Sequence, residues 1–225
     1  MNRIPPAFTR VELIASVAAV ALLGLAALPL LATPRADSER AGCFNNLRQL
    51  GIAMLKYADE HDDTFPPRIF PAWPERLRPY YKSTAVLVCP SDGPYPASFG
   101  SATNPADAAP RSYLFNGWSD YYQQVPPVGG AMPTSAIREP ARTILFGEKV
   151  TESGHFWMDY STFDDFMEVE HGRHLRTGNA ASGGSYFTFA DGSVQFLRWG
   201  ASLQPVNLWA IDPALRQWMP PQNEE

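Results

Sequence analysis

The chain has little of the chemistry on which most catalytic and metal sites depend. Its 225 residues include only two cysteines and four histidines. Neither cysteine has a second one nearby at the spacing of a zinc-ligand pair, which argues against a zinc site. The sequence also has no nucleophile elbow and no zinc-protease helix motif. We therefore expect no enzyme activity, no catalytic residues, no metal and no cofactor.

Positive charge is scarce as well. The formal net charge is -5, from 18 basic and 23 acidic residues, and no basic stripe is interleaved with aromatic residues. A nucleic-acid partner is therefore not expected. The 22 prolines and 16 glycines indicate a loop-rich domain, and the 12% aromatic content indicates a core built on large rings.

One long apolar run lies near the N-terminus. Residues 13–32 are interrupted only by Ser16 and Pro29. A helix of about 20 such residues rises about 30 Å, which matches the hydrocarbon core of a bilayer. We therefore expect a transmembrane helix over residues 8–32. Glu12 lies in its first turn, where a carboxylate is costly in lipid unless a positive group neutralises it.

Residues 1–7 have the position of a short leader before this run. In an ordinary secretory signal the cleavage site follows the apolar segment. Here a small residue, Ala7, precedes Phe8 and the apolar run begins afterwards. A cut between Ala7 and Phe8 would keep the helix and place a new α-amine about one helical turn from Glu12. That amine, or the same amine of a neighbouring subunit, would be the positive partner of the glutamate.

These residues resemble the N-terminus of type IV pilins and type II secretion pseudopilins. The resemblance rests on Phe8, Glu12 and an apolar helix that contains a proline, Pro29. It implies that a prepilin peptidase cleaves before Phe8 and methylates the new amine, and that Glu12 pairs with a neighbour's N-terminus during assembly. Ala7 departs from the family, in which glycine is usual before the cut. The alternative is an uncleaved signal anchor with an incidental glutamate.

Residues 33–63 are predicted to continue the helix as an amphipathic stalk. Pro66 and Pro67 prevent the helix from going further. The apolar face is expected to cover the domain formed by residues 64–225. Its members recur every three or four positions: Cys43, Phe44, Leu47, Leu50, Gly51, Met54, Leu55 and Ala58.

The stalk also resembles that of a large bacterial group of pilin-like proteins. The segment CFNNLRQLG at 43–51 is similar to the signature of that group, and shorter similar segments lie at 86–92, 112–118 and 183–194. In the group, a histidine lies nine residues before the Asp-Gly pair of a hairpin. Here sixteen residues separate His174 from Asp191, so we interpret residues 175–182 as an insertion.

Residues 64–225 are predicted to form a small antiparallel sheet with long loops. We expect short helices at 74–81 and 212–218 and strands at 85–89, 111–115 and 142–146. The clearest hairpin is 185–199, in which Asp191 and Gly192 form a two-residue turn of type I′. That turn would pair residue 189 with residue 194, and residue 187 with residue 196, on one core face.

Cys43 and Cys89 are expected to form a disulfide if the region after the span lies outside the cytoplasm. The bond would close a loop of 46 residues and contribute about 3 to 4 kcal/mol by the chain-entropy argument. Two separate buried thiols are the alternative.

Two polar clusters raise the possibility of a bound metal. The acids around His61 do not follow the spacing of a calcium-binding loop, so a solvated helix end is the preferred interpretation. Residues 155–174 are rich in ligand-type side chains but contain no recognised motif. We interpret them as solvent-facing polar residues. The members of the two clusters are Asp59, Glu60, Asp62 and Asp63, and His155, Asp164, Asp165, Glu168, Glu170, His171 and His174.

The expected fold is therefore a pilin-like α+β fold. In it a long N-terminal helix, half transmembrane and half amphipathic, packs on a small antiparallel sheet with long loops. The expected parts are a leader at 1–7, a transmembrane helix at 8–32, a stalk at 33–63 and a soluble domain at 64–225.

The resemblance implies a structural subunit, a minor pilin or pseudopilin, of a type IV pilus or type II secretion system. Its expected partners are a prepilin peptidase, other pilin subunits and inner-membrane lipid. Its expected location is the inner membrane, crossed once, with the C-terminal domain outside the cytoplasm, and then a pilus or pseudopilus. The alternative is a membrane-anchored envelope protein that binds a ligand or cell-surface polymer and does not polymerise.

Overall fold

The computed structural model describes residues 9–93, 95–100, 103–125, 130–159, 164–178 and 181–217. Within residues 23–35 it describes the helical backbone but not the side chains. The predicted leader and the cleavage site at Ala7 and Phe8 lie outside the described residues. The chain divides into two units, Met1–Glu39 and Arg40–Glu225, which are treated separately.

The first element, helix α1, comprises Arg10–Glu60. In the second unit its side chains follow the predicted amphipathic pattern, because Leu47, Leu50 and Met54 are fully buried. Leu55 departs from the prediction, since it is 37% exposed. The helix ends just before Asp62 and Asp63, which both adopt positive φ and turn the chain into the next strand.

The predicted transmembrane helix and single-pass inner-membrane location are wrong. Among the helices for which the structure gives side chains, none is both apolar and long enough to cross a membrane. The described side chains of the apolar segment are those of residues 10–22.

The main sheet has five strands in the order β5-β2-β4-β6-β7. Strand β5 runs parallel to β2, whereas every other pair is antiparallel. The parallel pair is held by backbone bonds from the N–H groups of Phe115 and Gly117 to the carbonyl oxygens of Phe156 and Met158. A separate two-stranded sheet pairs β1 with β3. The bounds are β1 Thr64–Phe65, β2 Tyr113–Asn116, β3 Met132–Pro133, β4 Ile144–Glu148, β5 Trp157–Met158, β6 Gly184–Phe189 and β7 Val194–Arg198.

The other described helices are short. The strand predicted at 85–89 is instead a 3₁₀ turn, in which the Ser83 hydroxyl accepts a hydrogen bond from the Ala85 N–H. The α-helices are α2 Trp73–Leu77, α3 Pro105–Ala108 and α4 Ser119–Gln124. The 3₁₀ helices are Arg78–Tyr80, Thr84–Leu87, Thr134–Ala136, Pro140–Arg142, Asp164–Glu168 and Pro213–Gln217.

The predicted fold class is therefore wrong as stated. It required a helix with a membrane-spanning half and an antiparallel sheet. The described part of the chain instead has no membrane-spanning helix and a mixed sheet surrounded by short helices and turns.

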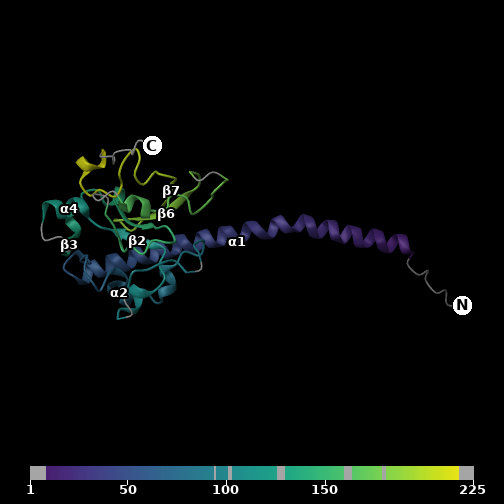
Figure 1. Cartoon of the computed structure of the whole chain (residues 1–225), viewed down its shortest axis with the longest axis horizontal. Helices are drawn as coiled ribbons and strands as arrows, with labels where there is room; N and C mark the ends of the chain where they lie inside the picture. Colours follow the sequence, from purple (N-terminus) through teal and green to yellow (C-terminus); the bar gives the residue numbers. More distant parts are fainter. Residues whose placement is uncertain are drawn as a thin grey trace. The chain divides into compact units, whose positions relative to one another are not determined.

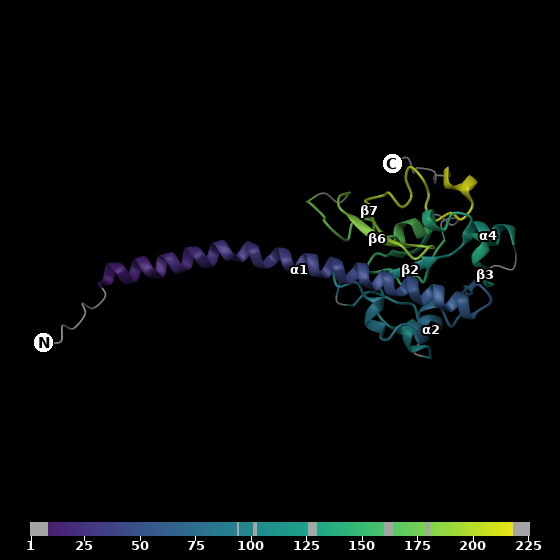
Figure 2. The ribbon, with the colours of Figure 1, turned by 180° about the vertical axis from the view of Figure 1, so that it is seen from behind.

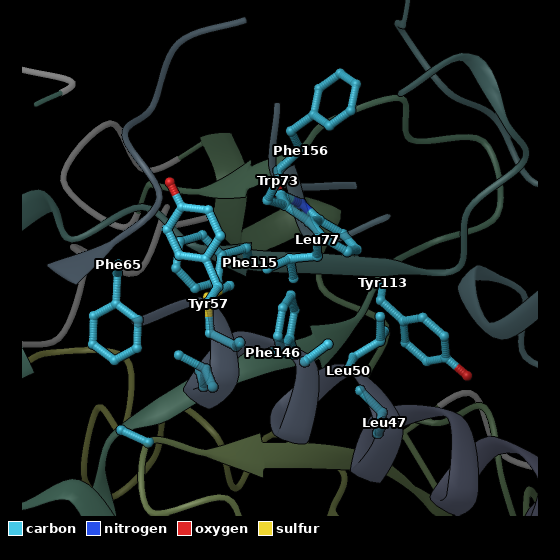
Figure 3. Packing of buried hydrophobic residues seen from close by; sticks show 14 of the residues in the cluster. Leu47, Leu50, Tyr57, Phe65, Trp73, Leu77, Tyr113, Phe115, Phe146 and Phe156 are labelled. Atoms are coloured by element: carbon cyan, nitrogen blue, oxygen red, sulfur yellow. The ribbon is translucent and has the colours of Figure 1, made fainter. Parts of the chain in front are cut away.

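Both faces of the main sheet are covered. In the second unit, the C-terminal part of α1 lies between α2 and strands β6 and β7 (Figures 1 and 2). On this face Leu47 and Leu50 of α1 and Trp73 and Leu77 of α2 gather around Phe146 of β4 (Figure 3). A second cluster covers the opposite face, and the C-terminal segment contributes the buried Trp209 to it. The core of this second cluster comprises Leu114, Ile144, Met158, Val169, Phe187, Phe189, Trp209 and Ala210.

The β6–β7 hairpin differs from the prediction by one residue in register. Thr188 pairs with Val194, and Tyr186 pairs with Phe196. The cause is the turn: the Gly192 N–H donates to the Phe189 carbonyl, and only Gly192 in the turn has positive φ. This is a type I turn followed by a glycine bulge, which adds one residue to the predicted two-residue loop.

The shifted register places Val194 and Phe196 of β7 beside Thr188 and Tyr186, and β6 itself packs on both faces. Phe187 and Phe189 face the second cluster, and the Phe187 ring centroid lies 6.1 Å from that of Trp209. Tyr186 and Thr188 face α1. The Thr188 hydroxyl donates to the Leu47 carbonyl over 3.1 Å, and the Tyr186 ring contacts Phe44.

Gly51 permits this close approach of α1 to β6. A Cβ atom at position 51 would lie 2.7 Å from Cγ2 of Thr188, which is closer than atoms in contact can lie. A glycine costs about 1 kcal/mol in a helix interior relative to alanine. Glycine is nevertheless suited to this position, because a larger residue would push the helix away from the sheet.

We predict that Gly51→Leu destabilises the domain. Overpacking at a rigid contact typically costs about 1 to 3 kcal/mol, and Thr188 is fully buried and β-branched. The measurement is urea unfolding of the full chain. The matched control is Ala41→Leu, which adds a leucine to an exposed site of the same helix and should leave the midpoint within experimental error. An equal loss in both variants would contradict the role given to Gly51.

Candidate functional site

Glu12 is described in the structure, and it caps the start of α1. The Thr9 N–H donates to Oε2 of Glu12 over 2.8 Å, and the Glu12 N–H donates to the Thr9 hydroxyl over 3.3 Å. This reciprocal pair is a capping box. Sequence reasoning missed it, although the pattern Thr-x-x-Glu before an apolar run is its usual signal.

The helix segment after this cap is apolar and exposed. Val11, Ile14, Val17 and Val20 are between 62% and 75% exposed, and Leu13 and Leu22 are similar. At 100° per residue these positions point in several directions around the helix, rather than along one stripe. Within its own unit, therefore, the segment offers apolar surface to more than one neighbour.

The two cysteines lie together in the second unit. Cys43 of α1 and Cys89, just after the 3₁₀ turn Thr84–Leu87, are joined by a disulfide, and their Cα atoms are 4.7 Å apart. Both are fully buried. The Cys89 N–H donates to the Ser112 hydroxyl over 2.9 Å, which fixes the backbone at this point.

A buried Glu–His pair adjoins the disulfide. Nε2 of His174 lies 2.9 Å from Oε1 of Glu148 and 4.0 Å from Sγ of Cys89. The side chains of Glu148 and His174 are 0% and 1% exposed. Glu148 comes from the end of β4, and its Oε2 accepts the Tyr186 N–H over 3.2 Å.

These four residues offer ligand-type atoms within 4.8 Å of one another. Of the residues with described side chains, they form the only group of three or more His, Cys, Asp or Glu side chains close enough to share a metal ion. This group was not predicted, because each cysteine had been judged only by its neighbours in the sequence. The sequence shows the motif segments that contain Cys43, Cys89 and the His174 region. It does not show that these segments lie together in the folded protein.

A second buried ionic network lies close by. Arg173 forms an ion pair with Asp92 and donates to the Lys149 carbonyl. Burial tends to raise the pKa of Asp92, but the charge of Arg173 and hydrogen bonds, including one from Thr151, bring that pKa below its ordinary value. Asp92 is therefore held as a carboxylate in the interior.

Lys149 is also fully buried. Its ammonium group donates to the Ser153 carbonyl over 2.5 Å. Burial, helped by the positive charges of Arg111 and Arg173, lowers the pKa of Lys149 to about 7, although Asp92 and Glu168 act in the opposite direction.

The remaining polar clusters do not form metal sites in the described residues. In the acidic cluster, His61 stacks on Tyr57 with ring centroids 3.8 Å apart, and Glu60 accepts a hydrogen bond from Tyr80. In the later cluster, His155 pairs with Asp165 over 3.0 Å, separately from the pair that His174 makes with Glu148.

Asp191 has a role in the turn rather than at His174. Its Oδ1 accepts the Ser193 N–H over 2.9 Å, and Gly192 supplies the positive φ. His174 instead pairs through its backbone with Gly184 and through its side chain with Glu148.

Comparisons with models of protein families, with curated proteins and with solved structures find no match to this chain.

The lowered pKa of Lys149 predicts a pH-dependent stability. In the unfolded chain this lysine has its ordinary pKa of 10.5, so between pH 7 and 10.5 the unfolded state binds more protons than the folded state. The free energy of unfolding should therefore rise with pH in this window, by up to about 1 kcal/mol per pH unit, and the lysine should contribute no slope below it.

Urea unfolding between pH 6 and 9 tests this expectation. Lys149→Met should reduce the rise, because the variant has no proton to lose. The matched control is Lys82→Met, at an exposed lysine, which should keep the slope of the parent protein. The same slope in all three proteins would mean that Lys149 keeps an ordinary pKa in the folded state.

Proposed function

We propose that the chain is a structural subunit of a type IV pilus or type II secretion apparatus, cleaved and N-methylated by a prepilin peptidase and assembled through its N-terminal helix with further pilin-type subunits. The observation that supports this proposal most directly is the exposed apolar segment of α1, whose side chains at 11, 13, 14, 17, 20 and 22 have little cover in the single chain. An exposed apolar surface of this kind favours association.

The distribution of these side chains favours several neighbours over one. A single groove covers one stripe of a helix, as in peptide recognition by a helix-binding groove. Apolar residues around most of the helix circumference are instead typical of a helix surrounded by others. Packing against equivalent helices of further subunits would bury them.

Glu12 supplies the charged element of this assembly. Its carboxylate is exposed and bonded within its own chain to Thr9. The amine of a cleaved neighbour could replace the Thr9 hydrogen bonds by an ion pair, which gains strength as the surrounding apolar side chains exclude water. The glutamate would thus set the axial position of one subunit relative to the next.

The first test concerns processing. Co-expression of the full chain with a prepilin peptidase should give a protein whose intact mass begins at Phe8 with one methyl group. Ala7→Leu, which enlarges the residue before the cut, should leave the leader attached. A chain that keeps Met1 in both cases would remove the basis for this function.

The second test separates the two roles of Glu12. Two differently tagged copies of the processed chain should co-purify. Glu12→Gln keeps the capping box but loses the charge, so it should reduce co-purification about fivefold. Thr9→Ala loses the cap but keeps the charge, and it should change co-purification less than twofold.

Glu39→Gln is the control for loss of one charge from α1, and it should have no effect on co-purification. If Glu12→Gln left co-purification unchanged and Thr9→Ala reduced it, the glutamate would act only as a cap. If wild-type copies did not co-purify after cleavage, the chain would be a non-polymerising binding protein instead.

A further inference from the structure

The disulfide and the Glu–His pair together contain the donors of a closed metal site. Two sulfur atoms, one imidazole nitrogen and one carboxylate oxygen lie within 4.8 Å of one another, and all four residues are buried. They come from four separate parts of the chain: helix α1, the segment after Leu87, the end of β4 and the residues before β6.

We propose that, when the Cys43–Cys89 bond is reduced, these four residues bind one zinc ion. The ligands are the two thiolates, Nε2 of His174 and the carboxylate of Glu148. The protein would thus have two alternative cross-links at one place, a disulfide in an oxidising compartment and a zinc ion in a reducing one.

The chemistry of the donors favours zinc over harder cations. Thiolate and imidazole ligands suit zinc, whereas calcium and magnesium need several oxygen ligands. Four protein ligands complete a tetrahedral structural site and leave no open position. Such a site would stabilise the fold rather than carry out a reaction.

The change between the two states balances in electrons and protons. A phosphine reductant donates two electrons to the disulfide and becomes a phosphine oxide, with water supplying the oxygen and two protons, and the S–S bond becomes two thiols. Zinc binding then displaces one proton from each thiol. Breaking the bond also frees the sulfur atoms to separate to about 3.7 Å, as two thiolates on one tetrahedral zinc require.

The surroundings hold the other two ligands in place. Oε2 of Glu148 accepts the Tyr186 N–H, which leaves Oε1 directed at the cluster. The backbone of His174 exchanges two hydrogen bonds with Gly184, of 2.8 and 2.9 Å. A zinc ion would also provide the buried Glu148 carboxylate with a permanent positive partner.

The test uses the full chain and zinc as the probe. The protein is reduced with a phosphine under native conditions, mixed with zinc, passed through a desalting column with a weak chelator and analysed for metal. We expect about one zinc per reduced chain and less than a tenth of that in the oxidised protein. Cobalt in place of zinc should give the intense visible bands of tetrahedral coordination and a thiolate-to-cobalt band.

Ligand variants identify the site. In the reduced state, His174→Ala should weaken zinc binding more than tenfold and change the cobalt spectrum, and Glu148→Gln should weaken it about tenfold. His155→Ala is the matched control, because His155 pairs with Asp165 outside the cluster, and it should bind zinc like the parent protein. Near-ultraviolet circular dichroism reports whether each protein stays folded.

Three outcomes would overturn the proposal. The reduced protein could retain no zinc. It could retain zinc equally well without His174, which would mean binding by the thiols alone. Finally, it could lose its near-ultraviolet signal and not regain it with zinc, which would mean that the metal binds an unfolded chain.

Discussion

The packing of α1 against the main sheet is the contact on which the rest of the second unit depends. Between Cys43 and Ala58 this helix contributes one complete buried face to the larger core cluster. At its middle, Gly51 brings the helix backbone within reach of β6, and Thr188 bonds directly to the Leu47 carbonyl. The distance between helix and sheet is therefore fixed by a glycine and one hydroxyl.

Other side chains of the same helix fix the segments that lie next to this contact. About two turns before the middle of the contact, Cys43 ties the helix to the segment that leads into β2. Beyond it, Tyr57 contacts Tyr80 and His61, so the helix end is held by stacked rings. The segments held in this way, at Cys89 and at the 3₁₀ helix Arg78–Tyr80, lie outside the strands of the main sheet.

The amphipathic helix could be predicted because its signal is local. A three/four spacing appears directly in the sequence, and Leu47, Leu50 and Met54 are buried as that spacing requires. For the hairpin, the position of the turn could be predicted but the register of the two strands could not. Its Asp-Gly turn was visible, but a glycine bulge and a type I′ turn differ by one residue, and alternation could not choose between them because β6 is buried on both faces.

The errors elsewhere have a common physical cause, which is dependence on contacts distant in sequence. The parallel pairing of β5 involves two residues, too few to leave a pattern. The transmembrane interpretation is a separate error, because it relied on the local apolar content of the N-terminal run and the described helices do not support it. The cluster at Cys43, Cys89, Glu148 and His174 joins four segments, so no local spacing could reveal it. The capping box at Thr9 and Glu12 is different, because its signal was present in four consecutive residues.

The two edge strands of the main sheet affect the tendency of the protein to aggregate when many copies are close together. An exposed strand edge is a template on which another chain can add a strand, and from there aggregates can grow. Here one edge strand, β5, has only two residues, and the other, β7, exposes Gln195, Phe196 and Arg198 among its five. Short length at one edge and a charge at the other both oppose edge-to-edge addition. If copies assemble through their helices, as proposed, these edges would keep their sheets separate.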